Sequence, residues 1–170
     1  MSRIWVAVDV HQLWTAAQYE YGSGNKIDFS VLMGELNKVK IQGDQITANA
    51  YLLDKAFHKD EKFIRVLTKI GFVPVEVPSY THQRQTKTTS STKMTIDALN
   101  AILNFDKFII VSGNGDLIPL VRHLRNCGKT VEIWSFREDA AGDLFKSATG
   151  VHFLNKEHLY VHATNNQSEN

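Results

Sequence analysis

Short apolar runs alternate with stretches of helical periodicity along almost the whole chain. Residues 108–111, Phe-Ile-Ile-Val, form the strongest run and are typical of a central strand that is buried on both faces. The predicted strands are residues 4–8, 46–53, 72–77, 108–111 and 129–134, with a short sixth at 151–154. The predicted helices are residues 11–21, 29–39, 60–70, 93–104, 117–126 and 140–146. This order predicts an α/β fold, a three-layer sandwich with a mostly parallel central sheet of about five strands and helices on both faces.

Length and charge limit the number of domains and the kind of partner. At 170 residues with 43% apolar content, the chain is expected to form one domain over residues 1–160, followed by a polar, disordered tail at 161–170. The formal net charge of +1 excludes a globally basic nucleic-acid binder. A surface that binds RNA must therefore be a local basic patch.

The single cysteine, Cys127, excludes an internal disulfide and a cysteine-based zinc site, and it favours a cytoplasmic location. We expect a small buried thiol there. No apolar segment is long enough for a signal sequence or a membrane span, so no membrane partner is expected.

Three aspartates are expected at one edge of the sheet. Asp9 directly follows the first strand, and Asp116 follows the strand at 108–111. Asp97 lies in the helix leading into that strand, whose N-terminal end reaches the same edge if the two run antiparallel. Carboxylates that converge repel one another unless a divalent cation lies between them, and hard oxygen ligands favour Mg²⁺ or Mn²⁺. Such a site is typical of phosphodiester hydrolysis.

Each of these acids also has a purely structural interpretation. Asp9 and Asp116 are both suited to cap the helices that follow them. Asp97 follows Lys93 by four residues, which is the spacing of an ordinary helical ion pair. The three acids together support a metal site more strongly than any one of them alone.

Residues 78–92 form a polar stretch that contains Arg84 and Lys87 but no acid. One interpretation is a mobile basic arm that contacts phosphates. The other is a solvated loop whose Ser90, Ser91 or Thr92 caps the next helix.

Further side chains are candidates near the same edge. Arg137 follows the strand at 129–134 and can hold a phosphate with its fork of donors, although a surface arginine is the commoner outcome. His11, beside Asp9, is expected mainly to begin a helix. The aromatic residues Trp14, Tyr19 and Tyr21 have helical spacing, which favours core packing over stacking on bases.

Three blocks in order resemble the signature of NYN domains, a LabA-like branch of the PIN-like nucleases. They are residues 6–13, residues 93–97 and the glycine-rich 111–120; residues 128–133, 143–144 and 153–154 resemble the family's ending. The resemblance implies a PIN-like fold, a metal-dependent ribonuclease and acidic site residues at Asp9, Asp97 and Asp116. We also expect Asn114 to assist the metal through its amide oxygen and Lys93 to neutralise phosphate or orient Asp97, with Ser112 as a further RNA contact.

The chain departs from the family pattern at several positions. Gln12 and Asn114 stand where the family usually has asparagine and aspartate, and Leu103 and Thr149 stand where acids are common. Asn114 removes a negative charge, so metal affinity should fall. The leading hypothesis is RNA hydrolysis with Mg²⁺ or Mn²⁺, and the alternative is a non-catalytic module that binds RNA or a protein through a degenerate acidic site. A third hypothesis is a homodimeric scaffold that pairs through the edge strand near Phe72.

Overall fold

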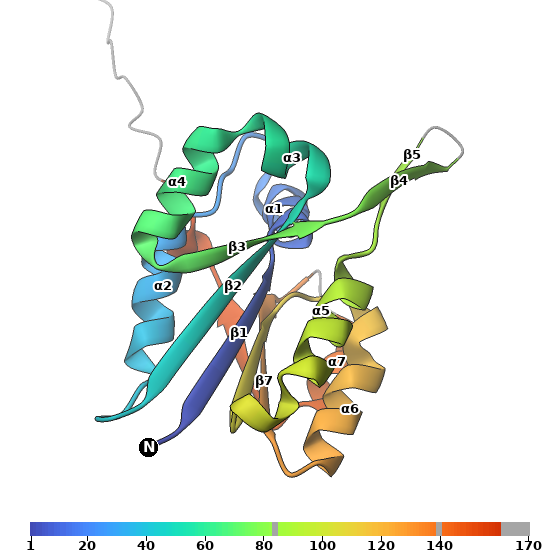
Figure 1. Ribbon diagram of the computed structural model, residues 1–170. Helices are drawn as coiled ribbons and strands as arrows, with labels where there is room; N and C mark the ends of the chain where they lie inside the picture. Colours follow the sequence, from blue (N-terminus) through green and yellow to red (C-terminus); the bar gives the residue numbers. More distant parts are fainter. Residues whose placement is uncertain (83–84, 139–140, 161–170) are drawn as a thin grey trace, which may run out of the picture.

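The computed structural model describes residues 1–82, 85–138 and 141–160. Its main sheet has six parallel strands in the order β3-β2-β1-β6-β7-β8 (Figure 1). These strands are β1 (Arg3–Asp9), β2 (Gln45–Leu53), β3 (Phe72–Val77), β6 (Lys107–Val111), β7 (Thr130–Phe136) and β8 (Gly150–Leu154). The sheet thus has six strands and not about five, because residues 150–154 pair with β7 along their whole length.

Helices cover both faces of the sheet, with α1, α2 and α4 on one face and α5, α6 and α7 on the other (Figure 1). Their bounds are α1 (Val10–Tyr21), α2 (Phe29–Lys38), α3 (Asp54–Lys59), α4 (Glu61–Ile70), α5 (Ser90–Asn100), α6 (Ile118–Asn126) and α7 (Gly142–Ser147). Short 3₁₀ turns are η1 (Ile102–Asn104), η2 (Gly115–Leu117) and η3 (Lys156–His158). The sequence pattern did not predict α3, because its six residues follow β2 directly and none of them is buried.

Two apolar cores lie on the two faces of the sheet. Alternate residues of β1 serve both, since Val6 and Val8 pack into one core and Ala7 into the other. The run at 108–111 divides in the same way, and all four of its side chains are completely buried. This double burial explains why the strands are apolar throughout instead of alternating with polar residues.

The strand order reverses between β1 and β6. From β1 the chain adds β2 and β3 on one side, and it then crosses over to add β6, β7 and β8 on the other side. In open parallel sheets, crevices form beyond the carboxyl ends of the strands at such a reversal. Asp9 is the last residue of β1, and the glycine-rich turn that begins at Ser112 directly follows β6, so both lie at this point.

Residues 78–92 form more regular structure than expected. β4 (Ser79–His82) pairs antiparallel with β5 (Gln85–Thr88), and this hairpin projects away from the main sheet (Figure 1). The prediction of a loop was therefore wrong, since a hairpin satisfies its backbone groups by local pairing. Arg84 and the side chain of Lys87 lie outside the described residues.

Helix α5 begins at Ser90 with Thr89 as its N-cap, and no side chain caps it. The expected cap by Ser90, Ser91 or Thr92 was wrong, because the Ser90 hydroxyl donates to Asp9 instead.

Strand β3 lies at one edge of the main sheet, so the predicted edge strand near Phe72 is confirmed.

Cys127 directly follows α6 as its C-cap and is exposed. Its Sγ lies 3.6 Å from Nε2 of His123. The expectation of a buried thiol was wrong, because α6 turns its last residues to solvent. Among the helices that the structure describes, none has the length and apolar character needed to cross a bilayer.

Candidate active site at the carboxyl edge of the sheet

Asp9 ends β1 and is only 1% exposed. One carboxylate oxygen caps α1 by accepting a hydrogen bond from the backbone N–H of Gln12 at 3.1 Å. The other accepts a hydrogen bond from Oγ of Ser90, at the start of α5, at 2.5 Å. Burial raises the pKa of Asp9 above its usual value, and the bonds from Ser90 and Gln12 oppose that rise. The capping interpretation is confirmed, and the carboxylate also joins two elements far apart in the chain.

Asn114 organises the turn after β6. Its Oδ1 accepts a hydrogen bond from the backbone N–H of Asp116 at 2.9 Å, and its Nδ2 donates to Oγ of Ser91 at 3.2 Å. The backbone N–H of Gly113 donates to Oε1 of Gln12 at 3.1 Å. Asp9 and Asn114 are therefore connected through neighbouring serines of α5, and Gln12 adds a direct link between the ends of β1 and β6.

Two residues of the same turn differ from expectation. Asp116 is exposed within η2, and the N-cap of this turn is Asn114, so the capping role proposed for Asp116 was wrong. Ser112 is completely buried, and its Oγ accepts a hydrogen bond from the backbone N–H of Asn114 at 3.2 Å. Ser112 thus shapes the turn and has no surface with which to contact RNA.

Asp97 lies further along α5 in a second polar group. Nζ of Lys93 is 2.5 Å from one carboxylate oxygen, and the hydroxyl of Tyr51 donates to the other at 3.1 Å. The side chains of Lys93 and Asp97 are 35% and 20% exposed, so this helical pair is confirmed but is more buried than an ordinary surface pair. Burial and the Asp97 carboxylate raise the pKa of Tyr51, which keeps its hydroxyl protonated as a donor.

The two polar groups are adjacent but separate. Tyr51 is the strand partner of Asp9 between β2 and β1, so Asp97 is linked to the residue beside Asp9. Within residues 1–82, 85–138 and 141–160, no three His, Cys, Asp or Glu side chains gather into a group that could hold a metal ion. The predicted convergence of Asp9, Asp97 and Asp116 is not formed in this arrangement, because Asp97 turns to Lys93 and Tyr51.

The remaining candidates lie around this edge. Arg137 follows β7, and its guanidinium lies 3.9 Å from the centre of the Phe153 ring. His11 is in the first turn of α1, as expected, with its ring 6.4 Å from that of Trp14. Both rings line a largely apolar cavity of about 590 Å³, which is also lined by Val10, the residue after Asp9. Trp14 is 44% exposed, so the prediction of core packing was wrong for it.

Tyr19 is exposed as well, whereas Tyr21 packs edge-on against Phe136. The core-packing prediction for the aromatics of α1 therefore holds only for Tyr21, which packs against the apolar core.

Sequence reasoning missed two contributors to this site. Ser90 was considered only as a helix cap, and Tyr51 was considered only as part of a strand. The available signal for Tyr51 was its hydroxyl in the apolar end of β2, at residues 50–53, since a buried phenol needs a hydrogen-bond partner.

Comparison with known proteins gives a family and a fold. The family model for the NYN domain matches residues 3–155. A solved structure of a protein of unknown function from Vibrio parahaemolyticus is similar, with a TM-score of 0.78 and 21% sequence identity over 94% of this chain and 96% of that chain. No curated protein matches the chain at a significant level.

Proposed function

The chain belongs to the NYN domain family, and from this premise we propose that it hydrolyses phosphodiester bonds of RNA at the carboxyl edge of its sheet. NYN domains fall in the PIN-like nuclease superfamily, whose members generally depend on divalent metal ions. We further propose that the chain lies in the LabA-like branch, which the blocks at residues 6–13, 93–97 and 111–120 support. A cytoplasmic location is part of the proposal and is supported by the single unpaired Cys127.

The observation that carries the proposal is the position of Asp9. It is an almost completely buried carboxylate at the end of a central strand, at the reversal of strand order. A buried carboxylate with a raised pKa is costly to keep ionised unless a positive charge lies nearby. Such groups concentrate at functional sites.

The donors at this edge suit Mg²⁺ or Mn²⁺ in chemistry and in number. They are hard oxygens from Asp9, Asn114 and Asp116, and no cysteine lies among them. Mg²⁺ in particular keeps several waters and needs only one or two carboxylates together with substrate phosphate. An ion held there would supply a polarised water and stabilise charge that develops on the phosphate.

The protein's own residues have distinct roles in this proposal. Lys93 leaves Asp97 to neutralise an incoming phosphate, and Asp97 is then free to face the edge. Tyr51 keeps a hydrogen bond on Asp97 during this exchange, which supports its orientation. Gln12 and Ser91 hold the turn after β6, so the oxygen of Asn114 stays fixed relative to Asp9.

The test is degradation of a mixed single-stranded RNA in Mg²⁺ or Mn²⁺ by the wild-type protein and by Asp9→Asn. We expect metal-dependent loss of RNA, and at least about a 100-fold lower rate for the variant, since even residues outside the metal shell cost 10- to 100-fold.

Asp28→Asn is a matched control, because Asp28 caps α2 through its side chain in the same way that Asp9 caps α1. It should cleave RNA at the wild-type rate. Equal RNA loss by the wild type and Asp9→Asn, or loss that persists in chelator, would contradict the proposal and indicate a contaminating nuclease.

The second candidate function is RNA binding without cleavage. It is favoured by the Lys93–Asp97 ion pair and by Asn114 in place of an acid, which together leave fewer free charges for a cation. In that case RNA would bind with equal affinity to the wild type and Asp9→Asn, with no RNA loss in any metal.

A further inference from the structure

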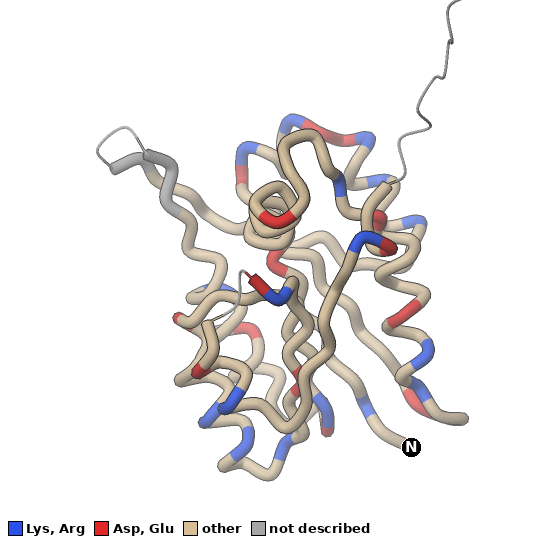
Figure 2. Tube along the Cα trace, turned by 180° about the vertical axis from the view of Figure 1, so that it is seen from behind, with Lys and Arg blue, Asp and Glu red and all other residues tan. Residues whose placement is uncertain are grey.

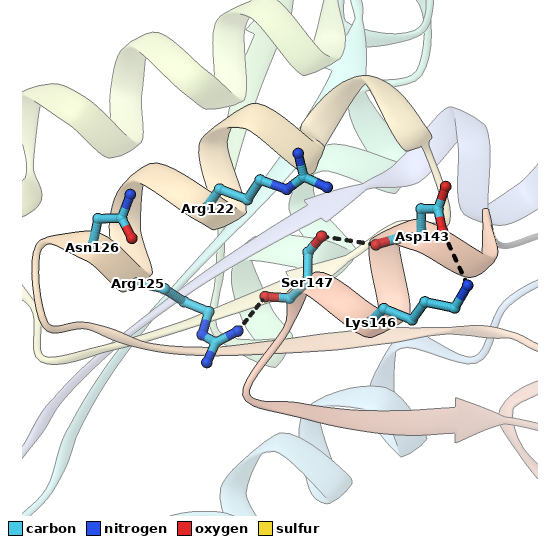
Figure 3. A pocket seen from close by; sticks show the side chains of 6 residues that line it. All are labelled: Arg122, Arg125, Asn126, Asp143, Lys146 and Ser147. Atoms are coloured by element: carbon cyan, nitrogen blue, oxygen red, sulfur yellow. Dashed lines mark hydrogen bonds and ion pairs between the residues drawn. The ribbon is translucent and has the colours of Figure 1, made fainter.

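A polar cavity lies between α6 and α7, outside the site at Asp9. It has a volume of about 510 Å³ and is lined by Arg122, Arg125, Asn126, Asp143, Lys146 and Ser147 (Figure 3). Three of these six side chains are cationic and one is acidic. With a net charge of +1 over the whole chain, the cavity holds an unusual share of positive charge.

The cations in this cavity are left available by their local contacts. Arg125 donates from Nη1 to the backbone carbonyl of Ser147 at 2.9 Å, which orients its guanidinium and leaves its other donors open. Arg122 has no hydrogen-bond or ion-pair partner among the described residues. Figure 3 shows both arginines extending from α6 toward α7.

The one acid does not cancel this charge. Asp143 pairs with Lys146 at 3.2 Å, but their side chains are 72% and 81% exposed. An ion pair so open to water is weak and exchanges readily for another partner. The cavity therefore presents two arginines and a lysine to an anion.

The cavity lies along two helices that start at the edge holding Asp9 and Asn114. Helix α6 starts directly after η2, and the backbone N–H of Ala141, just before α7, donates to the carbonyl of Gly113 at 3.2 Å. Both helices start at that edge and run away from it. The nine residues from Ile118 to Asn126 span about 13 Å at a rise of 1.5 Å per residue. Basic residues gather around these helices in the tube view, at its lower left (Figure 2).

We propose that the groove between α6 and α7 binds the phosphodiester backbone of RNA and leads the strand to the edge at Asp9. Arginine suits this ligand because its planar fork matches two phosphate oxygens. The groove has no aromatic side chain among its lining residues. It therefore recognises the charged phosphates of RNA and not the identity of the bases. This inference rests on the proposed function for its ligand, since RNA is the substrate proposed there.

The test measures binding separately from cleavage. The affinity of a fluorescent single-stranded RNA for the full chain is followed by anisotropy in chelator at several salt concentrations. The variants are Arg122→Gln/Lys146→Gln, which keeps the bond between Arg125 and Ser147, and the same pair with Arg125→Gln added. The control is Lys62→Gln/Arg65→Gln/Lys69→Gln, which removes the same charge from exposed positions of α4 on the opposite face.

The plot of log affinity against log salt has a negative slope. The triple groove variant should make this slope shallower by about 2, and the double variant by about 1. Affinity at moderate salt should fall about tenfold in the triple variant, while the α4 control stays close to the wild type. Circular dichroism establishes that each variant is folded. A groove variant that is folded and matches the α4 control in slope and affinity would overturn the inference.

Further outcomes separate this inference from the proposed hydrolysis. RNA binding that depends on the groove without any metal-dependent cleavage supports the groove and removes the nuclease. Cleavage with unchanged binding in the groove variants removes the groove alone. Binding of a fluorescent polyglutamate is measured in the same way. If the groove variants lose polyglutamate binding but keep RNA binding, the groove is assigned to an acidic protein and the RNA assignment is overturned. Absence of RNA binding by the wild type removes both proposals.

Discussion

At the scale of single residues, the candidate site depends on how one buried carboxylate is satisfied. Asp9 accepts hydrogen bonds from Gln12 in the helix that it caps and from Ser90, 81 positions away. Asn114 uses both ends of its amide in the neighbouring turn. These contacts fix the two oxygen donors before any ligand arrives, which favours tight positioning of a cation or phosphate.

Ser90→Ala removes the hydroxyl that donates to Asp9 and leaves a buried carboxylate with one fewer partner. We expect a loss of about 1–3 kcal/mol in the free energy of unfolding at neutral pH, measured by urea denaturation. Because Ser90 stabilises the charged form, the loss should shrink as the pH falls below the raised pKa of Asp9. Ser91→Ala, which leaves Asp9 untouched, is the control, and an equal loss in both variants would contradict this account.

Asn114→Asp restores a negative charge at the turn without changing its shape. An aspartate oxygen can still accept from the N–H of Asp116, and the other can accept from the Ser91 hydroxyl. We expect Mn²⁺ to bind at least about tenfold more tightly, or about 1.4 kcal/mol, in isothermal titration calorimetry. Asn126→Asp, at the far end of α6, should leave the affinity unchanged; no gain for Asn114→Asp would argue against metal at this edge.

At the scale of elements, the site forms where β1, β6 and α5 meet. The two strands are parallel neighbours, and α5 lies over one face of the sheet, with Ser90 and Ser91 at its start reaching both strand ends. The other ends of the same strands are tied by Arg3 and Asp106. The backbone N–H and guanidinium of Arg3 donate to the Asp106 carboxylate, which sets the register of β1 against β6.

The Arg3 bonds lower the pKa of Asp106 to about 2. Since the folded pKa lies below the unfolded value of about 3.9, the stabilisation is present above pH 4 and is lost as the pH falls toward 2. Asp106→Asn should therefore lower the thermal midpoint at pH 7, and the difference from the wild type should disappear near pH 2. Glu61→Gln, which breaks only the fully exposed pair with Arg65, is the control and should change little at any pH. A constant difference across the pH range would contradict the linkage.

At the scale of the whole molecule, one sheet separates two apolar cores. Each core uses alternate residues of the same strands, so neither can loosen without disturbing the sheet that both share. The sheet has two edge strands, β3 and β8, and the outer backbone groups of β3 have no strand beside them in the described residues. Pairing of two copies through β3 stays a prediction, and sedimentation of the protein at micromolar concentration would test it.

Phe108→Ala in one core and Phe29→Ala in the other should each cost about 3–5 kcal/mol in the free energy of unfolding. Phe108 is completely buried beside Phe105, and Phe29 packs edge-on against Phe63 and Phe72. Thermal unfolding should remain a single transition in both variants, because the sheet couples the cores. Val73→Ala, at a half-exposed position of β3, should cost much less. Two separate transitions would indicate that the cores unfold independently.

The sequence by itself determined the class of fold and the edge at which the site lies. Strand and helix periods are local properties, so the strands at residues 4–8 and 108–111 and the helix at 117–126 could be predicted within a few positions. Parallel strands place their carboxyl ends together, which brought Asp9 and Asn114 to one edge. The sequence did not determine the hairpin at residues 79–88 or the short α3, whose patterns are weak.

Only the tertiary structure decided which partner each polar side chain takes. Asp97 meets Tyr51 across 46 positions, and Asp9 meets Ser90 across 81. These pairs depend on the register of β2 beside β1 and on the rotation of α5 over the sheet. Register and rotation follow from packing of the whole core, so no local pattern in the chain contains them.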